Sequence, residues 1–144
     1  PSTITRLQNM GTPDYLISAA TQLVVAQRLA RKNCKNCKIP DDDVNPKVLQ
    51  DLGFSAEQAS RVKAIKGKGC ETCSNTGYKG RQGIYEILVV SKPLKEAILR
   101  KATTPELRQI AVKEGFQTMQ DMGKRLIASG DLNFREYERV LSNE

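Results

Sequence analysis

The chain has 144 residues, of which 39% are hydrophobic, and its 23 lysines and arginines against 16 acidic residues give a formal net charge of +7. A chain of this length can bury a core within one domain. No apolar run approaches the roughly 20 residues needed to span a bilayer, and no signal segment opens the chain, which predicts a cytoplasmic protein. The absence of histidine excludes Ser-His and Cys-His nucleophilic catalysis and a histidine-bound catalytic metal.

The first predicted elements are a helix and a strand. Thr12 is placed to cap a helix that has Pro13 at its first position and Asp14 near the positive end of its dipole. The composition becomes β-branched from residue 23, so we expect the helix to end near Gln22 and a strand to run to about Leu29. A single long helix is the competing interpretation.

Residues 31–79 differ from the rest of the chain because they carry two cysteine pairs, several glycines and a run of three aspartates. Asn45 and Ser55 are placed to cap two short helices between the pairs. The aspartates, residues 41–43, indicate a solvated turn, since no spaced series of oxygen ligands follows them. The segment is too polar to form a compact unit by itself, so we expect a metal ion to staple it.

The strongest strand signal lies at residues 83–90, where a nearly continuous apolar run predicts a strand buried on both faces. From residue 92 onward, apolar stripes at helical spacing predict short helices. Thr104 is expected to cap one of them. Asn133 and Glu136 form the capping-box pattern of the last one.

Cys34-Lys-Asn-Cys37 and Cys70-Glu-Thr-Cys73 are two C-x-x-C hooks. The two-residue gap of a hook folds as a tight turn whose backbone N–H groups point at the sulfurs, so each hook presents two thiolates to one centre. Two hooks complete a tetrahedral site with four sulfurs at about 2.3 Å from a zinc ion. Because no coordination position stays open, we predict one structural zinc ion rather than a catalytic metal.

The cysteines have three other interpretations. Two structural disulfides would suit a secreted protein, but the chain has the features of a cytosolic one. Two thioredoxin-like redox motifs would need a βαβ context that neither pair has. Iron uses the same set of four sulfurs, so the ligands alone do not separate it from zinc.

The basic excess suggests an acidic partner such as nucleic acid, a phosphate-bearing ligand or anionic lipid head groups. A zinc ion with four thiolates carries a net charge of −2, which lowers the +7 to about +5. Part of the remaining excess is local, because several lysines near the cysteines would balance that charge: Lys32, Lys35, Lys38 and Lys68.

An ordered series of motifs surrounds the hooks. The first hook follows Ala-Gln-Arg-Leu-Ala-Arg at residues 26–31, and the second leads through Thr-Gly-Tyr-Lys-Gly-Arg at residues 76–81 to Gly-Ile-Tyr-Glu at residues 83–86. This series resembles the carboxyl-terminal part of the type II secretion and type IV pilus-assembly ATPases, and the likeness covers almost the whole chain. Pilus-retracting members of that family typically lack the four cysteines, so the resemblance implies the extension or secretion branch.

The resemblance implies a hexameric RecA-like motor at the cytoplasmic face of the inner membrane, where it hydrolyses ATP with Mg²⁺ to assemble pilin or pseudopilin subunits. Its partners would be neighbouring subunits and inner-membrane platform or assembly proteins. Arg28 would lie near the nucleotide pocket as a contact for nucleotide or a neighbouring subunit, an ordinary solvated arginine being the alternative. Arg81 would contact the zinc loop, a subunit interface or neither, and the sequence leaves these three alternatives open.

The family's phosphate loop, acidic boxes and histidine box are expected upstream of Pro1, and the sequence contains no G-x-x-x-x-G-K-[ST] motif. Nothing in the chain would then position a γ-phosphate. We therefore predict a monomeric fragment that neither binds nor hydrolyses ATP by itself.

The predicted fold is α+β and mostly helical. We expect residues 1–33 to form the edge of a RecA-like core, 34–80 a tetracysteine zinc subdomain, 81–91 a returning core strand, and 92–144 a bundle of short helices. The rival hypothesis is a stand-alone basic zinc ribbon that binds nucleic acid. Aromatic residues make up only 5% and do not interleave with the cations as stacking platforms do, so we expect no nucleic-acid partner.

Overall fold

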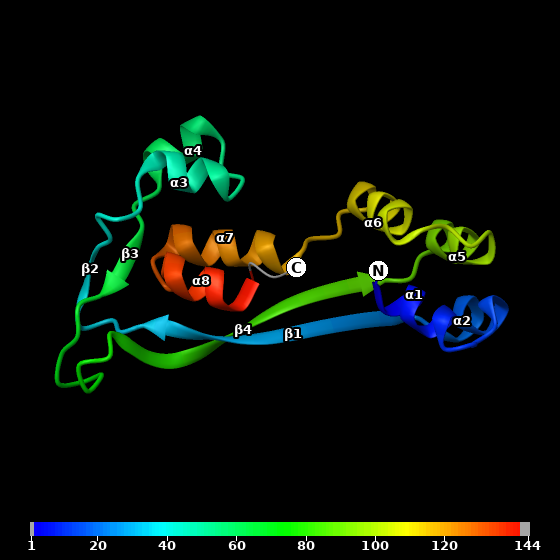
Figure 1. Cartoon of the computed structure of the whole chain (residues 1–144), viewed down its shortest axis with the longest axis horizontal. Helices are drawn as coiled ribbons and strands as arrows, with labels where there is room; N and C mark the ends of the chain where they lie inside the picture. Colours follow the sequence, from blue (N-terminus) through cyan, green and yellow to red (C-terminus); the bar gives the residue numbers. More distant parts are fainter. Residues whose placement is uncertain (1, 142–144) are drawn as a thin grey trace. The chain divides into compact units, whose positions relative to one another are not determined.

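The computed structural model describes residues 2–141 and has an α+β fold, as predicted (Figure 1). Contacts group these residues into two compact units. The first unit contains residues 2–26 and Glu86–Thr118, and the second contains Gln27–Tyr85 and residues 119–141. The helices of the predicted 92–144 segment are therefore divided between the units. Within residues 2–141, no helix combines the length and the apolar composition needed to cross a bilayer.

Two long strands pair with each other, and each contributes residues to both units. β1 spans Leu23–Asn33 and β4 spans Tyr78–Val89, and they run in opposite directions (Figure 1). The predicted change from helix to strand before residue 23 is confirmed. β1 continues beyond its predicted end at Leu29, and β4 begins before its predicted start, because each strand supplies the other's hydrogen-bonding partner.

The prediction that residues 83–90 are buried on both faces is wrong. Burial alternates along β4, so that Ile84 and Leu88 are buried while Tyr85, Ile87 and Val89 are exposed. A strand alternates its side chains between two faces, and the described residues cover only one face of this ribbon.

The first unit packs four helices around an apolar core. These helices are α1 (Ser2–Asn9), α2 (Asp14–Ala20), α5 (Lys92–Leu99) and α6 (Thr104–Lys113). Both predicted caps are off by one residue: Pro13 occupies the N-cap of α2, and the N-cap of α6 is Thr103, whose side chain accepts a hydrogen bond from the Glu106 N–H. The core comprises Ile4, Ile17, Leu88, Val90, Leu94, Ala97, Ile98, Ala102, Leu107 and Ala111.

The second unit contains short elements around the cysteine hooks and a helical hairpin. β2 (Lys38–Pro40) pairs antiparallel with β3 (Ile65–Gly67). Between them lie α3 (Pro46–Asp51) and α4 (Ala56–Arg61). The predicted caps are confirmed, because Asn45 accepts from the Val48 N–H and Ser55 forms a capping box with Gln58.

The helical hairpin consists of α7 (Met119–Ser129) and α8 (Phe134–Leu141). The predicted cap of α8 is confirmed, since the Asn133 Oδ1 accepts from the Glu136 N–H at 2.7 Å. The Glu136 carboxylate, however, turns to Arg31 and Arg139, with Nη2 of Arg31 at 3.0 Å and Nη2 of Arg139 at 2.8 Å. An ion-pair cluster centred on the buried Glu136 carboxylate thus lies where the sequence predicts an ordinary capping box, and both arginines stay about half exposed.

Candidate metal centre

The two hooks lie at the ends of strands that pair with one another. Cys34 follows the last residue of β1, and Cys37 precedes β2. Cys70 and Cys73 lie in the loop that joins β3 to β4. Cys34 and Cys73 are buried, and a backbone hydrogen bond from the Cys34 N–H to the Gly77 carbonyl, at 2.9 Å, joins the first hook to the loop that follows the second.

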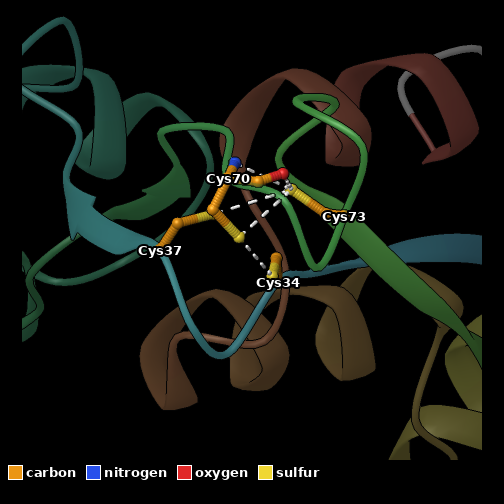
Figure 2. Close-up of side chains that lie close together, drawn as sticks. All are labelled: Cys34, Cys37, Cys70 and Cys73. Carbon is orange, nitrogen blue, oxygen red and sulfur yellow. Dashed lines mark hydrogen bonds between the residues drawn. The ribbon is translucent and has the colours of Figure 1, made fainter.

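The four sulfurs have the spacing of a tetrahedral site. They all lie within 4.8 Å of one another (Figure 2). Neighbouring sulfurs are 3.7 Å apart for Cys34 and Cys70, 3.7 Å for Cys70 and Cys73, and 3.9 Å for Cys37 and Cys73. A tetrahedron with metal–sulfur bonds of 2.3 Å has edges of about 3.8 Å. All four cysteines are free, and these separations are far above the roughly 2.05 Å of a disulfide, so the sulfurs fit one metal ion.

Backbone N–H groups point at two of the sulfurs, but they belong to Gly69, Cys70 and Gly77 rather than to the two-residue gaps that the sequence predicts. The Cys73 sulfur accepts from the N–H groups of Cys70 and Gly77, both at 3.2 Å. The Cys37 sulfur accepts from the N–H of Gly69 at 3.3 Å. Hydrogen bonds of this kind stabilise the thiolate form, which is the form that binds metal.

The electrostatics of the cluster favour a bound cation. Burial raises the pKa of Cys73, but the N–H groups of Cys70 and Gly77 outweigh it and lower that pKa to about 6. At Cys37 the N–H of Gly69 lowers the pKa, whereas desolvation and the neighbouring thiols raise it to about 11. One thiol therefore loses its proton readily, and its negative charge opposes the ionisation of the next thiol. A divalent cation at the centre would remove this opposition.

Two glycines allow the loop segments to approach closely. A Cβ atom on Gly67 would lie 2.0 Å from the Gly77 carbonyl oxygen, and one on Gly77 would lie 2.5 Å from the Gly67 carbonyl oxygen. Gly77 also has a φ of 81°, in the left-handed region that favours glycine. Any side chain at either position would separate the two loop segments that bring the hooks together.

Sequence reasoning missed the polar contacts that surround the hooks. Asn36 and Thr72 occupy the same position in the two hooks, and the Asn36 Nδ2 donates to the Thr72 Oγ1 at 3.0 Å. Asn33, directly before the first hook, is buried with an exposed fraction of only 1%. The one available signal is an asparagine at the end of a strand, which is too weak to single out from sequence.

The other candidate residues lie elsewhere in the second unit. Arg28 donates through Nη1 to the Val140 carbonyl, near the end of α8. Arg81 lines a hollow of about 280 Å³ with Arg31, Thr76 and Tyr78. Among residues 2–141, the four cysteines form the only close group of three or more potential metal-ligating side chains, so the three aspartates do not form a second such group.

Comparison with known proteins identifies the family. The sequence model described as "Type II/IV secretion system protein" matches residues 1–139, which is nearly the whole chain. The chain therefore belongs to the Type II/IV secretion system protein family.

Individual relatives come from both kinds of system. The chain is 35% identical to the "Type IV pilus assembly ATPase PilB" of Myxococcus xanthus over 94% of its length, and 40% identical to the PilB of Thermus thermophilus over 83%. It is 32% identical to the "Type II secretion system protein HxcR" of Pseudomonas aeruginosa over 96%. The chain spans 24%, 13% and 25% of the lengths of these relatives, which is a quarter or less.

Proposed function

We propose that this chain is the zinc-stapled, carboxyl-terminal structural region of a hexameric ATPase that powers type IV pilus assembly or type II secretion. The tetrahedral spacing of the four sulfurs, in a chain whose family includes pilus-assembly ATPases, is the observation that carries the proposal. A zinc ion there would hold the hooks together without an open coordination position, so its role would be structural. The binding of a structural zinc ion contributes on the order of 10 kcal/mol, comparable to the stability of a whole domain.

An uncovered apolar face supports the view that the first unit is part of a larger motor core. Leu23 and Val25 on β1 and Ile87 and Val89 on β4 are each more than half exposed. All four belong to the first unit and lie on the exposed positions of paired strands. Exposed apolar patches of this kind mark interaction surfaces. We infer that the RecA-like core of the parent protein packs on this face.

The chain itself would contribute structure rather than chemistry. It has no phosphate-loop motif, and therefore no cradle for a γ-phosphate. ATP and Mg²⁺ would bind to the rest of the parent, which would act in the cytoplasm at the inner membrane with platform proteins. Arg28 stays a proposed contact for nucleotide or a neighbouring subunit, and its bond to the Val140 carbonyl would hold it close to α8.

Elemental analysis tests the metal. The purified chain should contain about one zinc ion per molecule, and chelation should release it. If the protein instead shows the visible absorption of a four-sulfur iron centre, the bound metal is iron rather than zinc. A metal-free protein with two disulfides would overturn it.

An activity comparison tests the motor assignment. A longer version of the protein that carries the residues upstream of Pro1 should hydrolyse ATP, whereas the 144-residue chain should not. An inactive longer protein would contradict the motor assignment. Steeply salt-dependent binding of the short chain to random DNA would favour the rival nucleic-acid module.

A further inference from the structure

Asn33 joins the first hook to the turn between α7 and α8. Its backbone N–H donates to the Asp131 carbonyl at 2.8 Å, and its side-chain Nδ2 donates to the Gly130 carbonyl at 3.0 Å. The same Nδ2 donates to the Ile65 carbonyl of β3 at 3.1 Å. One buried residue next to Cys34 thus contacts both the helical turn and the strand that leads to the second hook.

A second set of contacts reaches the same hairpin from the other hook. The hydroxyl of Tyr78, which opens β4 after the second hook, accepts from Nδ2 of Asn133 at 2.9 Å. Asn133 in turn caps α8 through the Glu136 N–H. Arg31 lies 4.1 Å above the centre of the Tyr78 ring and pairs with the buried Glu136. Both chain segments that leave the cysteine cluster along β1 and β4 are therefore bonded to residues 130–136.

We propose that Asn33 positions the first hook against the α7–α8 turn, and that metal binding at the four cysteines consequently orders the α7–α8 hairpin. This inference rests on the proposed zinc site. Asn33 is a positioning residue, since it acts through the backbone of Cys34 and does not itself touch the metal.

The energetic reason is that buried polar groups need their partners. Asn33, Asn133 and Glu136 are all buried, and their partners are backbone and side-chain groups that keep their places only while β1 and β4 are held at the hooks. When the hooks separate and these partners are lost, hydration of the polar groups is lower in free energy than burial without partners. The hairpin should therefore open together with the metal centre, whereas α5 and α6, which pack in the apolar core of the first unit, should not.

Hydrogen-exchange mass spectrometry tests this on the zinc-loaded chain and on the same chain reduced and stripped by a chelator. Removing zinc should speed exchange in α7 and α8 by about tenfold or more, and in α5 and α6 by less than about twofold. With zinc bound, Asn33→Ala should speed exchange in α7 and α8 and also speed zinc release to a coloured chelator, each by about threefold or more.

Asn45→Ala is the matched control, because Asn45 lies in the same unit and its side chain caps α3 by accepting one hydrogen bond from the Val48 N–H rather than from the hairpin. It should leave zinc release unchanged. If Asn33→Ala does not fold, Tyr78→Phe serves instead, since it removes the hydroxyl that Asn133 contacts and keeps the ring beneath Arg31.

The outcomes separate this inference from the metal proposal. If one zinc ion binds per chain but hairpin exchange is the same with and without it, the metal site stands and the inference is wrong. If Asn33→Ala releases zinc no faster than Asn45→Ala, Asn33 is not a positioning residue. If no metal binds, the zinc proposal and this inference both fail.

Discussion

The two units of the molecule are stabilised in different ways. The first unit has a continuous core in which helices α1, α2, α5 and α6 bury aliphatic side chains. The second unit also buries large apolar side chains, among them Ile84, Ile127 and Leu132. Of the four buried polar residues in the described part of the chain, it contains three, Asn33, Asn133 and Glu136, while Ser18 lies in the first unit. Apolar burial stabilises without directional contacts, whereas the contribution of a buried polar group depends on the hydrogen-bond partners that it keeps.

We therefore expect the stability of each unit to respond to a different perturbation. The first unit should be sensitive to the volume of its side chains and insensitive to metal. The second should be sensitive to metal and to pH. Four experiments test this contrast.

Loss of the hooks should have the largest effect. Cys34→Ser combined with Cys73→Ser should abolish stoichiometric zinc binding, because two of four ligands are lost, and remove a stabilisation on the order of 10 kcal/mol. Elemental analysis and hydrogen exchange should show a metal-free second unit with weak protection and a first unit that stays protected. Ser74→Ala, an exposed change beside the second hook, is the control and should keep its zinc.

A cavity in the first unit should have the next largest effect. Leu94 is fully buried in α5, so Leu94→Ala should lower the free energy of unfolding by about 2–5 kcal/mol in a denaturant titration. Leu99→Ala, in the same helix at an exposed position, should change it by less than about 0.5 kcal/mol. Loss of zinc from Leu94→Ala would contradict the independence of the two units.

Acid should weaken the second unit through Glu136. Burial raises the pKa of this carboxyl, but hydrogen bonds from Arg139 and Arg31 outweigh it and lower the pKa from 4.5 to about 2. Because the folded state binds the proton less tightly, about 3 kcal/mol of stability is present above pH 4.5 and is lost as the pH falls towards 2.

Glu136→Gln should therefore destabilise the protein by about 3 kcal/mol at pH 7 and flatten the loss of stability between pH 4.5 and 2. Unfolding titrations across this range measure both effects. Glu138→Gln, at an exposed position of the same helix, is the control. An unchanged acid dependence in Glu136→Gln would refute the role of this carboxyl.

Loss of a helix cap should have the smallest effect. Ser55→Ala removes the hydroxyl that accepts the Gln58 N–H at 3.1 Å and should lower the free energy of unfolding by about 1 kcal/mol. Ser60→Ala, at an exposed position in the same helix, should have a smaller effect. Equal effects in an unfolding titration would mean that the capping box does not contribute to stability.

Local residue patterns were enough to predict much of this structure. The two hooks were identified from the spacing of the cysteines, because a C-x-x-C turn places its own sulfurs. The caps at Asn45, Ser55 and Asn133 were equally predictable, since a cap bonds a backbone N–H only three residues ahead. The resemblance to the secretion ATPases also followed from short motifs around the hooks and was confirmed by the family match.

Only the tertiary structure decided which distant groups meet. The bond from Asn33 to Gly130 and the ion pair of Arg31 with Glu136 join residues about a hundred positions apart, and no local pattern specifies such a pair. The same holds for the exposed face of β4, because an apolar run does not reveal how many faces find partners. The sequence by itself thus determined the two cysteine hooks and the caps at Asn45, Ser55 and Asn133, and long-range packing determined which helices share a unit with the four cysteines.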